Sequence, residues 1–231
     1  MTRSDGTPTN AVYGFTQMLL KIVEDTEADY LAVIFDRARK TFRNEIYSEY
    51  KAHRPPPPED LIPQFELIRE ATRAMNIKAV DMDGYEADDL IATYARQAAE
   101  RGAEVTVVST DKDLMQIVGG KIKMFDAMKN LAIGPDQVRE KFGVDPERVI
   151  DVQALAGDST DNVPGVQGIG IKTAALLIEK FGDLEGVLNH ATDIKQPKRR
   201  QALIEQADLA RISRDLVTLR QDVPVEVSLD K

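Results

Sequence analysis

The chain has 231 residues, with 30 Lys plus Arg against 39 Asp plus Glu, and therefore a formal net charge of −9. It contains no cysteine and only two histidines, which excludes a disulfide framework, a thiolate metal site, a cysteine nucleophile and a multi-histidine zinc site. No stretch approaches the ~18 consecutive apolar residues of a membrane span, and the first residues lack the apolar core of a secretion signal, so we expect a cytoplasmic protein. The acidic balance argues against coating of nucleic acid by bulk charge, but it leaves room for a local basic surface.

The first part of the chain alternates between helix and strand patterns. Apolar spacing predicts helices over residues 10–24 (with Thr9 and Asn10 as capping residues), 59–75 and 86–101, and strands over residues 30–35, 77–80, 104–109 and 121–125. This alternation predicts an α/β fold with a mostly parallel sheet and helices on both faces.

After about residue 135 the strand pattern disappears, and short helices broken by glycines are predicted. They cover residues 146–156, 172–181, 183–190 and 198–220. We therefore predict a first domain over residues 1–150 and a small all-helical domain over residues 151–231.

Acidic residues gather where the predicted strands end. Asp36 follows the first predicted strand. Glu86, Asp88 and Asp89 follow the second, and Asp111 and Asp113 follow the third. The carboxyl ends of parallel strands share one rim of a sheet, so these groups should converge there, and Asp158 and Asp161 repeat the three-residue spacing of Glu86 and Asp89. Such a cluster needs a cation, and oxygen ligands suit Mg²⁺ or Mn²⁺. For any one motif alone, helix capping is the simpler explanation.

A basic segment over residues 37–54 follows the first of these acidic positions. Six cations (Arg37, Arg39, Lys40, Arg43, Lys51 and Arg54) are interleaved with the aromatic residues Phe42, Tyr47 and Tyr50. Cations and aromatic rings together suit a single-stranded nucleic acid, whose phosphates meet the charges and whose bases stack on the rings. The alternative is a solvated amphipathic helix with its aromatic residues in the core.

A glycine-rich segment over residues 163–173 is the third motif. It is not a nucleotide-binding P-loop, because its Lys172 stands one place late and no strand precedes it. Gly165, Gly168 and Gly170 before an apolar helix suit a helix–hairpin–helix, whose backbone amides contact a DNA phosphate. The alternative is a plain glycine turn. A second basic patch follows at Lys195, Lys198, Arg199 and Arg200.

Taken in order, these motifs resemble one family over nearly the whole chain. The motifs are Phe35-Asp36, Lys40-Thr-Phe-Arg43, Glu49-Tyr-Lys51, Arg54-Pro-Pro, Glu86-Ala-Asp-Asp89, Thr110-Asp-Lys-Asp113 and Gly157-Asp-Ser-Thr-Asp-Asn-Val-Pro-Gly165. Together they are similar to the 5′-nuclease domain of bacterial DNA polymerase I, which belongs with the flap endonucleases. The resemblance implies a PIN-like domain with a basic arch at residues 37–58, followed by a helix–three-turn–helix domain.

The resemblance also implies a function and a site. The implied activity is metal-dependent cleavage of 5′ ends and 5′ flaps of DNA, and of RNA primers, with two Mg²⁺ or Mn²⁺ ions and a K⁺ ion at the hairpin. The implied metal ligands are Asp36, Glu86, Asp88, Asp89, Asp111, Asp113, Asp158 and Asp161. The implied catalytic cations are Lys51 and Arg54. The implied DNA contacts are Arg39, Lys40, Arg43, Tyr50, Gly165, Gly168, Gly170, Lys172 and Thr173. The implied partners are DNA and a polymerase domain, in the same chain or acting separately, with the nuclease itself a monomer and no membrane involved.

One departure from the family pattern gives a second hypothesis. The family segment at Gly6 to Gly14 lies almost at the start, so we expect the family's first strand and its metal-binding Asp to be missing. The chain would then be a catalytically incomplete, DNA-binding fragment. A Mg²⁺ phosphatase acting on small molecules is a third hypothesis, but it leaves the basic segment and the glycine hairpin unexplained.

Overall fold

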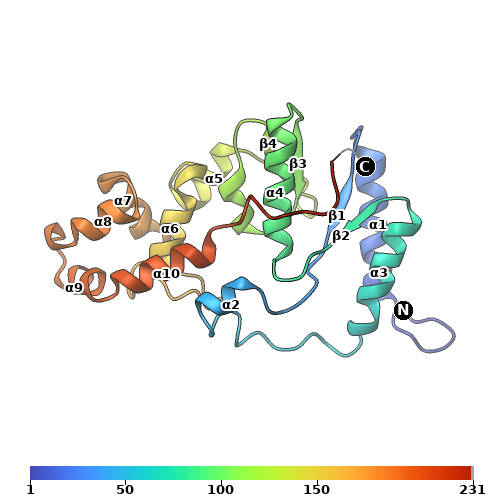
Figure 1. Cartoon of the computed structure of the whole chain (residues 1–231), viewed down its shortest axis with the longest axis horizontal. Helices are drawn as coiled ribbons and strands as arrows, with labels where there is room; N and C mark the ends of the chain where they lie inside the picture. Colours follow the sequence, from blue (N-terminus) through green and yellow to red (C-terminus); the bar gives the residue numbers. More distant parts are fainter. Residues whose placement is uncertain (230–231) are drawn as a thin grey trace. The chain divides into compact units, whose positions relative to one another are not determined.

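The computed structural model describes residues 1–229 and divides the chain into two compact units (Figure 1). Unit 1 combines Met1–Arg37 with Pro55–Met82, and unit 2 combines Ala38–Arg54 with the chain from Asp83 onward. Among the described residues, no helix is both long and apolar enough to cross a membrane. The predicted division at residue 150 rests on a change of sequence pattern and stays a prediction.

Unit 1 contains two helices that lie side by side and a short parallel sheet. Helix α1 (Asn10–Asp25) packs on α3 (Ile62–Ala74), and strand β1 (Ala32–Ile34) pairs with β2 (Lys78–Val80). Thr9 stands at the N-cap position of α1, as predicted, but its side chain makes no capping hydrogen bond. Buried Gln64 caps α1 instead, since its Oε1 accepts from the amides of Ala11 at 2.7 Å and Val12 at 3.2 Å.

Unit 2 carries a three-stranded sheet. Strand β3 (Val105–Val108) runs parallel to β4 (Ile122–Asp126), and β5 (Leu131–Ile133) returns antiparallel to β4. Sequence analysis missed β5, whose hairpin is held by Asp126 Oδ1 accepting from two turn amides. Helix α4 (Ala87–Glu100) packs against β3 and β4, and a 3₁₀ helix, η1 (Lys112–Ile117), follows β3 (Figure 1).

The rest of unit 2 is helical. Its elements are α2 (Phe42–Ile46), α5 (Pro135–Phe142), η2 (Pro146–Arg148), α6 (Val149–Ala156), α7 (Ile171–Phe181), α8 (Leu184–Asn189), η3 (Ala191–Asp193), α9 (Pro197–Glu205) and α10 (Ala207–Val217). The predicted helix over residues 198–220 is two helices, broken at Gln206, whose Oε1 accepts the Gln167 amide. Helix α5 was missed, although Pro135 at its start and left-handed Gly143 at its end are ordinary helix signals.

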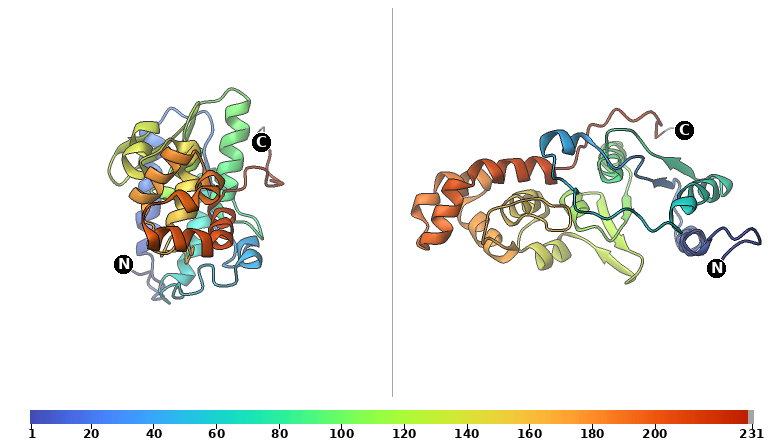
Figure 2. Two further views of the ribbon diagram at one scale, coloured as in Figure 1. Left: turned by 90° about the vertical axis from the view of Figure 1, so that its left-hand side faces the viewer. Right: turned by 90° about the horizontal axis from the view of Figure 1, so that it is seen from below.

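The larger of two hydrophobic clusters runs through unit 2. Buried residues of α4, β3, β4 and α5 to α9 form a single cluster, so the helical region and the sheet share their apolar interior. The views of Figure 2 show α10 alongside α6, the helix that it packs against most extensively. Consequently, the loops at the ends of β3, α4 and α6 are anchored in one packed body.

Two glycines hold the loop after α6 in close backbone contact. Gly165 has φ +61°, and a Cβ placed on it would lie 2.4 Å from the Gly157 nitrogen. We expect Gly165→Ala to lower the free energy of unfolding by about 1–3 kcal/mol, because the added methyl group forces backbone apart at a strained φ. Urea denaturation measures the loss. Gly168→Ala is the matched control, since Gly168 also has a positive φ but open space around it. Equal losses in the two variants would contradict this explanation.

Candidate metal and nucleic-acid site

The carboxylates of Glu86 and Asp161 lie on either side of one ammonium group. The Nζ atom of Lys51 is 2.7 Å from Glu86 Oε1 and 3.5 Å from Asp161 Oδ2. Arg54 pairs with the other Asp161 oxygen, Oδ1. Both carboxylates are largely buried, whereas 21% of the Lys51 side chain is exposed. Two of the eight predicted metal ligands thus meet both predicted catalytic cations.

Backbone contacts dock the basic segment on the loop after α6. The amide of Lys51 donates to the Asp161 carbonyl at 2.9 Å, and Asn162 Nδ2 donates to the Glu49 carbonyl at 2.7 Å. Lys51 and Asn162 both adopt left-handed backbone conformations, with φ +55° and +58°. Such conformations are costly for residues other than glycine and persist where surrounding contacts impose them, often at functional sites. Lys51 is therefore held in place by its backbone as well as by its charge.

Tyr50 occupies a position different from the one that sequence analysis implied. Its ring is buried, and its hydroxyl lies 3.2 Å from Glu86 Oε2 and 3.3 Å from Asp161 Oδ2. Burial and the nearby Glu86 carboxylate raise the pKa of Tyr50, so the hydroxyl keeps its proton and can donate to one of the two carboxylates. In this structure Tyr50 is a support for the carboxylate pair, and it is not placed to stack on a base.

A second acidic group lies at the start of η1 and in the loop after α6. Asp111 Oδ1 accepts the Asp113 amide at 2.9 Å, and Asp113 Oδ1 accepts Gln153 Nε2 at 2.6 Å. Lys112 pairs with the buried carboxylate of Asp158. Burial, followed by the negative charge of Asp111, raises the pKa of Asp113 to about 6. The amide oxygen of Gln153, Oε1, is buried and has no hydrogen-bond partner among the described residues.

The raised pKa of Asp113 predicts a pH-dependent stability. The folded chain takes up this proton at a pH where the unfolded chain does not, so the contribution of Asp113 to the free energy of unfolding increases as pH falls from about 7 to 4. In EDTA, we expect Asp113→Asn to be more stable than the parent chain at pH 7.5, by about 1–3 kcal/mol, and to lose this part of the pH dependence. Denaturant titrations at several pH values measure it, with the exposed Asp193→Asn as control. An unchanged pH profile would contradict the assignment.

Arg43 and Asp89 form a buried ion pair. Arg43 donates to both carboxylate oxygens of Asp89, at 2.6 and 2.8 Å, and to the Leu216 carbonyl at 2.7 Å. Although burial acts to lower it, the ion pair with Asp89 raises the pKa of Arg43. Asp89 also accepts the amides of Glu86 and Arg220. The structure therefore gives both residues a structural role: Arg43 is too buried to contact nucleic acid, and the oxygens of Asp89 are already used.

Asp88 and Asp36, the remaining predicted ligands, lie outside the two acidic groups described above. Asp88 lies in the first turn of α4, and Asp36 lies after β1 in unit 1, where its carbonyl accepts Arg69 Nη2 at 2.7 Å. Within residues 1–229, no three His, Asp or Glu side chains converge closely enough to hold a metal ion by themselves. Glu86 and Asp161 come together around Lys51 instead, and Asp158 pairs with Lys112.

The residues fit a divalent cation by the chemistry of their donors. The donors are carboxylate oxygens. The position between Glu86 and Asp161 already accommodates a positive charge, the ammonium group of Lys51. Glu86, Asp161, Asp111, Asp113 and Asp158 are the residues of unit 2 that could hold such ions.

The glycine hairpin joins the loop after α6 to α7. Its turn is held by Val166, whose amide donates to the Leu155 carbonyl at 2.8 Å, and Gly170 caps the start of α7. Cβ atoms added at Gly168 or Gly170 would meet nothing within 4 Å, so the backbone there is open to close approach. Lys172 is exposed beside it. Gly165 is buried instead, with its amide donating to Ser213 Oγ.

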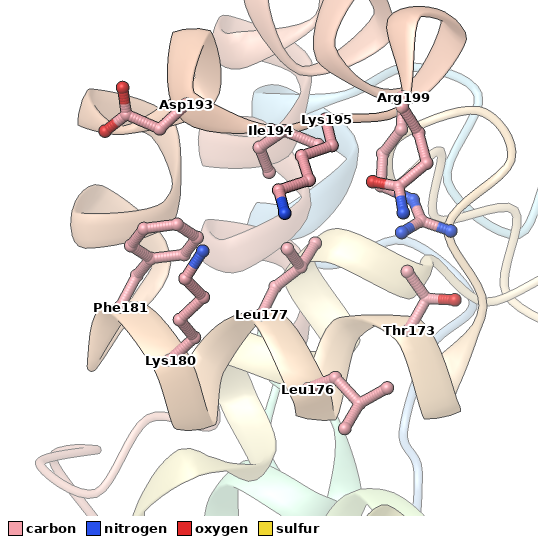
Figure 3. Close-up of a pocket in the computed structure, with 10 residues that line it drawn as sticks. Thr173, Leu176, Leu177, Lys180, Phe181, Asp193, Ile194, Lys195 and Arg199 are labelled. Carbon is pink, nitrogen blue, oxygen red and sulfur yellow. The ribbon is translucent and has the colours of Figure 1, made fainter.

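A pocket of about 330 Å³ lies between α7 and the segment from η3 to α9. Figure 3 shows Lys180, Lys195 and Arg199 around it, with Thr173 at one side and Leu177 at its base. The Nε atom of Arg199 is buried without a partner among the described residues. This pocket places part of the second basic patch close to the start of α7.

Sequence reasoning missed three contributors to this site: the Tyr50 hydroxyl, Gln153 and the pairing of Arg43 with Asp89. None of these contacts had a signal in the sequence that indicates both partners. The three-residue spacing of Glu86 and Asp89 indicates a capping box, and both capping hydrogen bonds are present, but this spacing does not point to Arg43.

Two family models together match the whole chain. The model described as the 5′-3′ exonuclease N-terminal resolvase-like domain matches residues 1–143, and the model described as the 5′-3′ exonuclease C-terminal SAM fold matches residues 144–231.

Similar proteins and structures agree with these models. DNA polymerase I of Rhizobium leguminosarum is 55% identical over 99% of this chain and 23% of its own length, and that of Bacillus caldotenax is 43% identical over 97% and 26%. The chain thus spans about a quarter of the curated relatives it matches. A structure of zinc-bound T5 5′-exonuclease superposes with a TM-score of 0.80 at 24% identity, covering 93% of this chain and 82% of that one. The Rad2 catalytic core in complex with DNA has a TM-score of 0.59 at 14% identity, covering 98% and 76%. These structural likenesses show the fold: a PIN-like α/β region followed by a SAM-like helical region.

Proposed function

The chain belongs to the 5′-3′ exonuclease family, and from this premise we propose that it is a metal-dependent 5′ nuclease. It hydrolyses phosphodiester bonds at 5′ ends and 5′ flaps of DNA, and of RNA primers paired to DNA, in replication and repair. The observation that carries the proposal is the placement of Lys51 between the Glu86 and Asp161 carboxylates, with Arg54 on the same Asp161. Both matching family models describe exonuclease domains, which supports this hypothesis over that of a fragment that only binds DNA.

The proposed cofactor is Mg²⁺, or Mn²⁺ in its place, bound as two ions. When bound, such ions activate water and stabilise the leaving oxygen of an in-line displacement. Glu86 and Asp161 would contribute to one ion and Asp111, Asp113 and Asp158 to the other. Asp36 and Asp88 are proposed as further ligands on the family resemblance alone. Asp89 is assigned to the fold, because four donors already use its oxygens.

Lys51 and Arg54 are the proposed catalytic cations. Both side chains are partly exposed while their charged ends lie at the carboxylates, so a substrate phosphate can approach each of them from solvent. Preorganised positive charge of this kind stabilises the negative charge that develops on the phosphate in the transition state. Tyr50 and the strained backbone around Lys51 keep these groups in position.

Nucleic acid would bind through surfaces on both sides of the carboxylates. Arg39 and Lys40 are exposed on the basic segment, and Arg39 Nη2 donates to the Arg54 carbonyl at 2.9 Å. Gly168, Gly170, Lys172 and Thr173 offer amides and a cation to the phosphates of a duplex, with a K⁺ ion shared at the hairpin. The cations around the pocket of Figure 3 extend this surface. The negative net charge is compatible with this, because bound metal ions reverse the local charge.

The proposed setting is removal of primers beside a polymerase, which either continues the same chain or acts separately. The nuclease itself is proposed to act as a monomer. No base contacts are proposed, so affinity should fall steeply with salt and depend little on sequence.

A substrate panel tests the proposed function. The chain is incubated in Mg²⁺ with a 5′-flap duplex, a nicked duplex, an RNA-primed duplex, blunt DNA, and a small phosphate ester. We expect cleavage of the flap at the junction, with 5′-phosphate and 3′-hydroxyl ends, and no cleavage in EDTA. Binding of the flap without cleavage would favour the binding-only hypothesis. Turnover of the small ester without DNA affinity would favour the phosphatase.

A further inference from the structure

The chain places its own cations on the carboxylates that are proposed to hold metal ions. Lys51 bridges Glu86 and Asp161, and Lys112 pairs with Asp158. Lys112 is the middle residue of the Asp111-Lys-Asp113 motif, so its ammonium group also lies in the field of two further carboxylates. Each of these two lysines therefore serves a different acidic group.

These ion pairs compete with metal ligation. An ammonium group at 2.7 Å occupies one lone pair of a carboxylate oxygen, and a divalent cation at the same carboxylate would repel the ammonium group. Binding of a metal ion at Glu86 or Asp158 therefore favours withdrawal of the lysine.

The side chains of Lys51 and Lys112 are more exposed than the side chain of Arg43 in its buried ion pair. Their side chains are 21% and 32% exposed, so each has an open path to solvent. Arg43, which pairs with Asp89, is 1% exposed and makes further bonds to backbone carbonyls. Arg43 is therefore fixed in its ion pair with Asp89, whereas solvent reaches the ion pairs of Lys51 and Lys112.

We propose that Lys51 and Lys112 are exchangeable counter-cations: each neutralises its carboxylates and is displaced when a divalent cation binds there. The inference rests on the proposed function and deepens it. It assigns Lys112 the role of a charge-neutralising residue, which balances the carboxylate of Asp158 until the ion takes its place. For Lys51 the displacement has a second consequence, because its ammonium group becomes available to a substrate phosphate only once the carboxylates have a metal partner.

Chemical labelling of lysines tests the displacement on the unaltered chain. The chain is acetylated briefly with and without Mn²⁺, without DNA, and each lysine is quantified by mass spectrometry. We expect the reactivity of Lys51 and Lys112 to rise about 3- to 10-fold with Mn²⁺, since a paired ammonium reacts slowly. Lys198, which is exposed on α9 and forms no ion pair within the described part of the chain, should be unchanged. Unchanged or lowered reactivity of Lys51 and Lys112 would overturn the proposal.

Variants test the competition independently. We expect Lys51→Met and Lys112→Met to bind Mn²⁺ about 3- to 30-fold more tightly by calorimetry in the absence of DNA, because a competing charge has been removed. Lys198→Met makes the same change in net charge and should bind within about twofold of the parent chain. If the lysines were merely structural, their removal would weaken metal binding or leave it unchanged, and either result would overturn the proposal.

The two experiments separate this inference from the proposed function. A chain that binds no Mn²⁺ contradicts both. A chain that binds Mn²⁺ while both lysines keep their reactivity contradicts the exchange alone and leaves the nuclease proposal standing.

Discussion

Replacing Arg43 by alanine is expected to lower the free energy of unfolding by about 3–5 kcal/mol, among the largest single effects in this chain. The substitution leaves the buried Asp89 carboxylate without its bidentate partner and removes the hydrogen bond from Nε to the Leu216 carbonyl. An uncompensated buried charge is costly because water cannot replace the lost donor.

Urea denaturation of the variant beside Arg96→Ala provides the measurement and its control. Arg96 also pairs with an acid, Glu100, but on the exposed surface of α4, so its removal should leave the unfolding midpoint nearly unchanged. Equal midpoints for Arg43→Ala and the parent chain would show that Arg43 is not the central support described here. They would also reopen its assignment to nucleic-acid contact.

Replacing Lys51 by alanine is expected to reduce the rate of flap cleavage about 100- to 1000-fold at saturating Mg²⁺. The loss follows from removing a preorganised positive charge from the place where negative charge develops on the phosphate. Metal affinity should move in the opposite direction, because the competing ammonium group has gone. A variant that binds metal more tightly and cleaves more slowly is difficult to explain by misfolding.

Single-turnover cleavage with DNA in saturating amounts measures this effect. Lys198→Ala is the matched control, since it removes the same charge from an exposed helix position. Lys51→Arg keeps the charge but not the compact ammonium geometry, so it should fall between the two. Cleavage by Lys51→Ala within about twofold of the parent chain would remove Lys51 from the proposed catalytic residues.

Local patterns predicted much of the fold. Helices α1, α4 and α7 and strands β1 to β4 were predicted from apolar spacing and capping residues, and their boundaries differ from the structure by at most two residues. These elements are continuous in sequence and have strong apolar faces, so short windows contain their signal. Strand β5 and the break between α9 and α10 depend on turn contacts from Asp126 and Gln206, which a window does not contain.

The candidate site was predictable in its composition but not in its arrangement. Strand ends and motif spacing indicated a set of acidic residues, of which the structure brings Glu86 and Asp161 together around Lys51. They did not indicate that Asp89 is committed to Arg43, 46 residues earlier, or that Tyr50 meets Asp161, 111 residues later. Long-range pairings of this kind depend on the packing of the whole unit, and it is these pairings that separate structural from functional carboxylates.

The most direct test of the central claim compares two chains on one substrate. A 5′-labelled flap duplex is incubated in Mg²⁺ with the parent chain and with a chain carrying Asp113→Ala and Asp161→Ala, after equal binding of the duplex has been established. The proposed nuclease predicts release of the flap by the parent chain and none by the double variant. Equal cleavage by the two chains, or binding without cleavage by the parent chain, would contradict it.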